Sequence, residues 1–123
     1  MYKGKVIFHS LGNFAFDMLK DKISPDTYKV YNYEPDPEYP TFAFPPDSRK
    51  TMIVKCIVSN KKIEKVSFLP VMINKLGQPE ILPRSDKRAQ EVLNYVKWCC
   101  EDQKLDTNLF FEGDEVNVDT KGR

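Results

Sequence analysis

Two neighbouring stretches in the middle of the chain are rich in β-branched and aromatic residues. They are residues 51–59 (Thr-Met-Ile-Val-Lys-Cys-Ile-Val-Ser) and residues 62–69 (Lys-Ile-Glu-Lys-Val-Ser-Phe-Leu). This composition favours strands. Only two residues separate the stretches, and the first is Asn60, which is typical of a hairpin turn. The pattern predicts a β-hairpin, with Pro70 ending or bending the second strand and the next residues continuing it at a sheet edge.

Near the C-terminus the apolar positions change to helical spacing. Over residues 86–103 they recur every three or four positions, which predicts an amphipathic helix with one face toward the core. Ser85 or Asp86 can cap its first turn, because either side chain can accept a hydrogen bond from a free backbone N–H. The expected inner face consists of Ala89, Val92, Leu93, Val96 and Cys100.

The N-terminal region carries a continuous apolar run rather than an alternating one. Val6, Ile7 and Phe8 predict a strand over residues 2–8 that is buried on both faces. The Leu-Gly-Asn that ends at Asn13 then predicts a tight loop, because Gly and Asn tolerate positive φ.

Residues 18–50 predict a long irregular excursion, because five prolines fall within twelve of its residues. Six aromatic residues lie between positions 28 and 44, which favours an ordered, packed loop over a disordered linker. A short edge strand is expected over residues 28–33. Beyond the helix, residues 109–111 are apolar and are expected to dock on the core, whereas residues 112–123 predict a polar tail with a fraying end. The expected fold class is α+β, with a hairpin-rich sheet and one C-terminal amphipathic helix.

Composition narrows the function classes. A length of 123 residues suits a single domain. The 19 Lys and Arg residues nearly balance the 18 Asp and Glu residues, so no nucleic-acid partner is expected. No apolar run approaches the length of a transmembrane segment. Three cysteines, one histidine and no Cys-x-x-Cys motif argue against a disulfide framework and against a metal site in this chain.

One motif adds a more specific expectation. The stretch from Lys5 to Asp17, Lys-Val-Ile-Phe-His-Ser-Leu-Gly-Asn-Phe-Ala-Phe-Asp, resembles a signature of the bacterial capsule-synthesis (CapA, poly-γ-glutamate) family. Residues 49–54 and 63–71 resemble the strands that follow this signature in that family, and a Gln-Pro pair and a closing helix come next in the same order.

The resemblance implies the C-terminal part of a calcineurin-like metallophosphoesterase domain. That fold is a four-layer α/β sandwich with a divalent metal pair whose bound hydroxide attacks a phosphoester. The family's metal-ligand motifs lie upstream of its signature, and this chain contains none of them. Residues 1–123 are therefore expected to be a single partial domain, inactive alone and without a cofactor of its own. Its expected partner is the missing N-terminal part or a self-associated copy, in a parent protein of the bacterial cell envelope or cytoplasm.

The signature loop supplies the candidate site residues. Ser10 and Asn13 follow the expected first strand, where α/β folds place active-site groups. Asn13 can donate to a phosphate or orient upstream histidines. Alternatively, Asn13 supplies the turn and Ser10 caps a backbone group. His9 is expected to pack within the strand, with metal or acid–base work as the other possibility. No residue of this chain is expected to be a catalytic group or a metal ligand.

A different class of function is also compatible with the sequence. The chain can be a free-standing, non-enzymatic interaction module. In that case it would bind a protein partner through the aromatic and proline-rich loop of residues 18–50 and through an exposed sheet edge.

Overall fold

The computed structural model describes residues 5–15, 23–30 and 32–119. It is an α+β structure with a five-stranded antiparallel sheet in the order β1-β2-β5-β4, and β3 pairs with β2 outside this path. The elements in chain order are α1 (Pro25–Val30), a 3₁₀ turn η2 (Pro46–Arg49), β1 (Lys50–Ser59), β2 (Lys62–Ile73), β3 (Pro79–Ile81), α2 (Lys87–Asp102), β4 (Asn108–Glu112) and β5 (Glu115–Asp119).

The predicted hairpin is confirmed, and its second strand is longer than expected. Asn60 and Lys61 have φ values of 48° and 61°, as a tight two-residue turn requires. β2 continues through Pro70 as far as Ile73. The Pro70 carbonyl accepts a hydrogen bond from the Leu82 N–H at 2.9 Å. Because the carbonyl and the amide of one strand residue point to the same side, the position where Pro70 lacks an N–H also faces Leu82. On that side the pairing passes from β5 to β3, so the proline interrupts neither ladder.

The predicted polar tail contains a strand that sequence analysis missed. β5 pairs with β4 and also with the middle of β2, where Ser67 lies opposite Asn117 and Phe68 opposite Val116. Polar and apolar residues alternate along β5, so Val116 is fully buried while Glu115 points to the other face. The apolar residues 109–111, expected only to dock, belong to β4. Residues 120–123 lie outside the described part.

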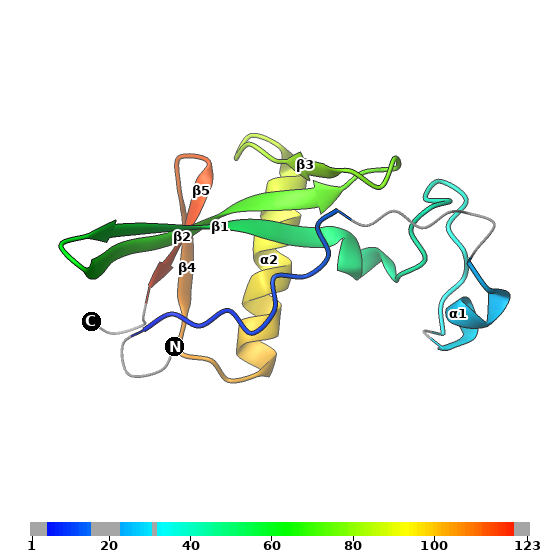
Figure 1. Cartoon of the computed structure of the whole chain (residues 1–123), viewed down its shortest axis with the longest axis horizontal. Coiled ribbons are helices and arrows are strands. Elements are labelled where there is room, and N and C mark those ends of the chain that lie inside the picture. The colour runs from blue at the N-terminus through cyan, green and yellow to red at the C-terminus, as the bar shows by residue number, and fades with distance from the viewer. Residues whose placement is uncertain (1–4, 16–22, 31, 120–123) are drawn as a thin grey trace.

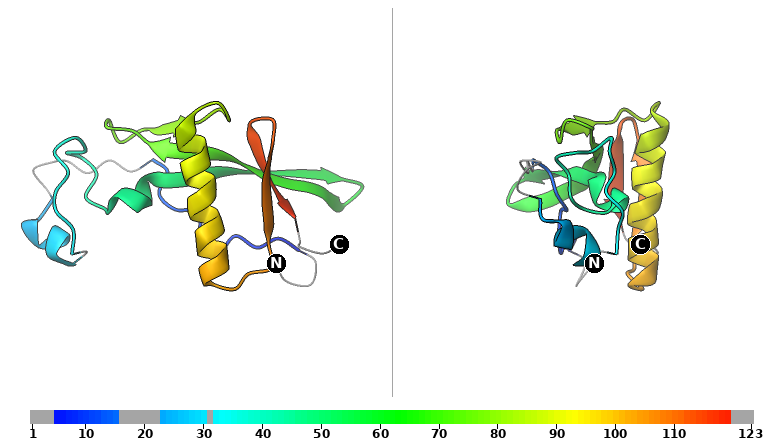
Figure 2. Two further views of the ribbon diagram at one scale, coloured as in Figure 1. Left: turned by 180° about the vertical axis from the view of Figure 1, so that it is seen from behind. Right: turned by 90° about the vertical axis from the view of Figure 1, so that its right-hand side faces the viewer.

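Helix α2 has the predicted position and inner face. Asp86 is its N-cap, and its carboxylate accepts a hydrogen bond from the Arg88 N–H at 2.9 Å. The helix crosses one face of the sheet (Figure 2). Beneath it, Phe68, Leu93, Leu109 and Val116 form one buried cluster, and Leu82, Ala89 and Val92 form a second.

Two sequence expectations about the N-terminal half are wrong. Residues 6–8 are extended but form no ladder, and only Lys5 makes an isolated bridge; residues 2–4 are not described. The edge strand expected over residues 28–33 is not formed by its described residues, because α1 runs to Val30 and residues 32–33 belong to no strand. Pro25 at the first helical position, and the Ser24 hydroxyl that accepts from the Asp26 N–H at 3.3 Å, favour a helix start there.

The described part of the excursion is an ordered loop at one end of the molecule, opposite the turn of the β1–β2 hairpin (Figure 1). Arg49 holds it together and is only 8% exposed. Its guanidinium donates to Asp36 at 2.7 Å and lies 3.4 Å from the centroid of the Tyr39 ring. The bond from Arg49, with one from the Glu38 N–H, lowers the pKa of Asp36. These contacts pack residues 36–49 of the excursion together. The ordered loop expected over the whole of residues 18–50 stays a prediction, because residues 18–22 and 31 lie outside the described part.

The start of α2 carries a second cationic centre, and it predicts a pH dependence. Arg88 donates two bonds of 2.9 Å to Glu80 and also bonds Asp86, at 2.6 Å from its terminal nitrogen. These bonds lower the pKa of both carboxyls from their ordinary values of 4.5 and 3.8. Such a carboxyl has a lower pKa in the folded state than in the unfolded state. Its full stabilising contribution is present at pH values above the unfolded-state pKa, and the contribution is lost as the pH falls through the folded-state pKa.

We therefore expect an Arg88→Met variant to be less stable than the parent near neutral pH, and the difference to shrink in acid. The measurement is the urea midpoint of both proteins from about pH 7 down to about pH 3. Arg84→Met is the control, because the Arg84 guanidinium lies 5.6 Å from the centroid of the Phe111 ring and forms no ion pair with a carboxylate of the described residues. A parent–Arg88→Met difference that stays constant with pH would contradict the assignment.

Candidate functional site

A cleft of about 860 Å³ lies between the N-terminal segment and the body of the domain. One wall is the extended chain of residues 6–13. The opposite wall is built from the start of β1, the C-terminal half of α2, and β4. His9, Ser10 and Asn13, the three residues singled out by sequence, all line it. The apolar floor includes Met52, Phe68, Val96, Cys100, Leu105, Leu109 and Val118.

Two polar contacts attach the signature loop to η2 and to the start of β1. The Thr51 hydroxyl donates to the Leu11 carbonyl at 2.8 Å, and the Asn13 side-chain amide donates to the Ser48 carbonyl at 3.4 Å. Within the loop, the Gly12 N–H donates to the Ser10 hydroxyl at 3.3 Å. Gly12 has φ +79°, and a Cβ there would lie 3.4 Å from the Thr51 hydroxyl oxygen. The Ser10 hydroxyl thus caps a backbone N–H of the loop, Gly12 rather than Asn13 supplies the positive φ, and the Asn13 side chain ties the loop to η2. The ligand-facing roles of Ser10 and Asn13 stay predictions.

His9 lies exposed at the edge of the cleft. Among residues 5–15, 23–30 and 32–119, no three His, Cys, Asp or Glu side chains gather closely enough to hold a metal ion. A metallophosphoesterase needs two metals held by several such ligands. The residues described here therefore do not fit a metal pair, and we assign no reaction step through one.

The polar end of the cleft is built by residues that the sequence motifs did not indicate. The Lys50 ammonium pairs with Asp47 at 2.6 Å and lies 4.8 Å from the centroid of the Tyr95 ring. Burial raises the pKa of Tyr95, and the neighbouring Cys99 adds to this effect. These residues come from η2, β1 and α2. The one signal in the sequence was the helical spacing of α2, which places Val96 and Cys100 on its inner face, next in the chain to Tyr95 and Cys99.

The thiols of the cleft are poor candidates for nucleophiles. Burial raises the pKa of Cys100, and Cys99 raises it further. A nucleophilic cysteine needs a lowered pKa and a basic neighbour. No such neighbour is found beside Cys100 in the described chain. The cleft offers an apolar surface with a polar rim.

Large apolar side chains of the signature segment remain exposed. The exposed fractions are 49% for Ile7, 48% for Leu11 and 44% for Phe14. Ile7 and Leu11 line the cleft with part of their side chains and present the rest to solvent, whereas Phe14 lies outside its lining. An exposed apolar stretch of this kind marks a surface that another chain or segment can cover.

The sheet face opposite α2 has a different character. Lys55 pairs with Glu115 at 2.5 Å, and Lys65 pairs with Glu112. The Ser67 hydroxyl donates to Glu115 at 2.7 Å. This cross-strand network makes the part of the face around Ser67 polar. Two positions further along the β1–β2 ladder, Ile53 and Leu69 lie opposite each other and give the same face apolar positions.

Comparison of the chain with protein-family models, curated proteins and solved structures found no match. Neither described helix combines the length and the apolarity that crossing a bilayer requires.

Proposed function

We propose that this chain is the C-terminal portion of a CapA-like, metallophosphoesterase-like protein that acts in the synthesis of poly-γ-glutamate capsule or another cell-envelope polymer. The Ser-Leu-Gly-Asn-Phe motif supports the proposal through its resemblance to the family signature. On this proposal the metal ligands lie in an upstream part of the protein, and this chain has no hydrolase activity alone.

The single observation that carries the proposal is the exposure of the signature segment. A run such as Val6-Ile7-Phe8 is typical of a strand with both faces covered, yet here Ile7 is half exposed and the run has no ladder. A companion sheet from upstream would cover it and complete the layers of the sandwich.

Phosphodiesterase turnover tests the proposal on the isolated chain. With bis-nitrophenyl phosphate and Mn²⁺ we expect no hydrolysis above the protein-free blank, because the described residues contain no metal cluster. Robust turnover by this chain alone would overturn the proposal. The DNA upstream of the Met1 codon gives an independent readout. An in-frame Gly-His-x-Pro-His motif would support the parentage, and an unrelated sequence would argue against it.

The interaction module is the second candidate, and the outer half of the hairpin favours it. β1 is an edge strand, and Val58 and Ile63, which lie opposite each other in its register with β2, are 61% and 59% exposed. Light scattering together with thermal unfolding separates the candidates. A stable monomer with a cooperative transition supports an autonomous module, whereas oligomers or a molten state fit a partial domain.

A further inference from the structure

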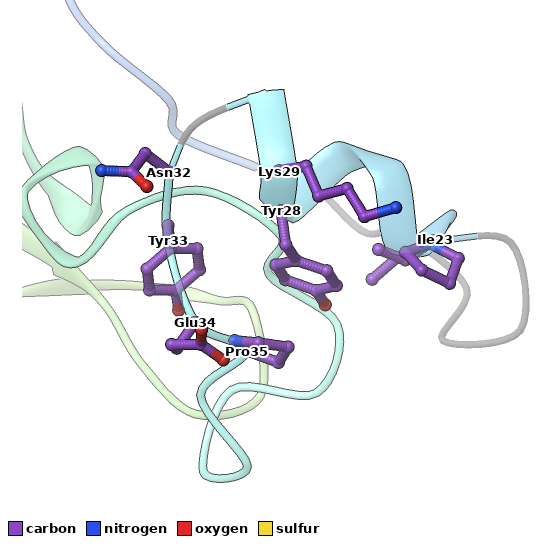
Figure 3. A pocket seen from close by; sticks show the side chains of 8 residues that line it. Ile23, Tyr28, Lys29, Asn32, Tyr33, Glu34 and Pro35 are labelled. Atoms are coloured by element: carbon purple, nitrogen blue, oxygen red, sulfur yellow. The ribbon is translucent and has the colours of Figure 1, made fainter.

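A second pocket, of about 630 Å³, lies at the far end of the molecule between α1 and the chain that follows it (Figure 3). It shares no residue with the cleft under the signature segment. Both of its walls come from the aromatic and proline-rich excursion. The lining residues are Ile23, Pro25, Tyr28, Lys29, Asn32, Tyr33, Glu34 and Pro35.

Two tyrosine rings form a shared aromatic surface in this pocket. The ring centroids of Tyr28 and Tyr33 are 5.9 Å apart, and their planes are inclined by 45°. A cation is attracted to an aromatic face when it lies within about 6 Å of the centroid. A group placed about 4 Å above the midpoint of the two rings would lie within that distance of both. One cation can therefore contact the two rings together.

The pocket carries a carboxylate whose charge is not neutralised by the described residues. Glu34 lines the pocket beside the rings, and no hydrogen bond or ion pair to it is found in the described part of the chain. The nearby Lys29 ammonium bonds Asp26 at 2.8 Å and points away from the rings in Figure 3. The pocket thus combines aromatic faces with negative charge, and Lys29, the cation among its described lining residues, is already paired with Asp26.

The same loop already holds a cation with the same kinds of group. The guanidinium of Arg49 lies over the Tyr39 ring, pairs with Asp36 and donates to the Tyr33 hydroxyl at 3.3 Å. Tyr33 belongs to both arrangements, with its hydroxyl toward Arg49 and its ring toward the pocket. The excursion therefore places an aromatic ring beside a carboxylate twice. Tyr39 and Asp36 surround the guanidinium of Arg49, whereas Tyr33 and Glu34 line the open pocket.

We propose that this pocket binds a weakly hydrated organic cation, a quaternary ammonium or guanidinium group, from a small molecule or a side chain. Such a cation loses little hydration on entering a half-apolar pocket, and the rings and Glu34 replace the water it leaves. A primary ammonium ion is strongly hydrated and is expected to bind less well. The inference does not depend on the proposed parentage of the chain.

The test titrates the full chain with choline chloride at low ionic strength and follows the tyrosine ring resonances by NMR. We expect saturable shifts with a Kd on the order of millimolar. The matched ligand is dimethylbutanol, in which carbon replaces the choline nitrogen. We expect it to bind at least about fivefold more weakly, because the cation–π attraction and the charge pairing are both lost.

Variants assign the binding to this pocket. Tyr28→Leu is expected to weaken choline binding about fivefold and Glu34→Gln about threefold, whereas Tyr28→Phe keeps the ring and the affinity. Glu64→Gln, which removes an exposed carboxylate on β2, is the matched control and should leave the affinity unchanged. The proposal would be overturned if choline did not saturate, or if dimethylbutanol bound as tightly as choline. A methyl glycoside, titrated as a neutral sugar ligand, would also overturn it by binding more tightly than choline at the same resonances.

Discussion

Replacing Phe68 with alanine is expected to lower the free energy of unfolding by about 3–5 kcal/mol. The ring is 1% exposed and lies in β2 between Val54 on one side and Val116 on the other. Its cluster also includes Leu93 of α2 and Leu109 of β4, so one cavity would weaken contacts among four elements. Urea unfolding followed by circular dichroism gives the measurement.

Ile63→Ala is the matched control for this prediction. Ile63 also belongs to β2, but it is 59% exposed near the hairpin turn. Substitutions at such positions change stability by about 0.5 kcal/mol or less. If Phe68→Ala costs no more than Ile63→Ala, the core is not centred on Phe68.

Replacing Arg49 with methionine is expected to destabilise the chain by about 2–3 kcal/mol. The substitution leaves the Asp36 carboxylate beside an apolar loop without the guanidinium, and the Tyr39 ring loses its cation. Arg49→Lys should recover only part of the loss, because an ammonium cannot stack on the ring and reach Asp36 with a planar fork. Urea unfolding measures the stability, and limited proteolysis should show faster cleavage within residues 33–45.

The contrasting substitution is Lys29→Met. Lys29 and Asp26 form an ion pair whose two side chains are each 78% exposed, and pairs of this kind contribute little to stability. We expect unchanged stability and unchanged proteolysis for this variant. Equal effects of Arg49→Met and Lys29→Met would show that the buried cation does not organise the loop.

The parts of the fold predicted from sequence are those set by local pattern. The hairpin follows from two β-rich stretches around Asn60, and α2 follows from its three- and four-residue spacing and from the Asp86 cap. β5 was missed because Glu115, Asn117 and Asp119 make it look polar, although Val116 between them is buried. Pairing with β2, some fifty residues earlier, makes it a strand.

The candidate sites show the same division. His9, Ser10 and Asn13 are close in sequence, so placing them on one loop required no tertiary information. The far wall of the cleft, including Lys50 and Tyr95, depends on how α2 crosses the sheet. The strand expected over residues 2–8 is not formed by the described residues 5–8. An apolar run becomes a strand only when another strand pairs with it. The sequence pattern does not predict the tyrosine pocket, because the alternation over residues 28–33 indicates an edge strand, whereas Tyr28 lies on α1.

The junction between β2 and β5 has a consequence for how the molecule opens. Within residues 32–119, two residue pairs, Ser67 with Asn117 and Phe68 with Val116, join the β4–β5 ribbon to the rest of the sheet. The β1–β2 ladder, in contrast, extends over the full length of β1. Few backbone bonds must therefore break for the C-terminal ribbon to separate as a unit. Local unfolding of this ribbon requires less free energy than global unfolding, so its amide hydrogens are expected to exchange with solvent before those of the long hairpin.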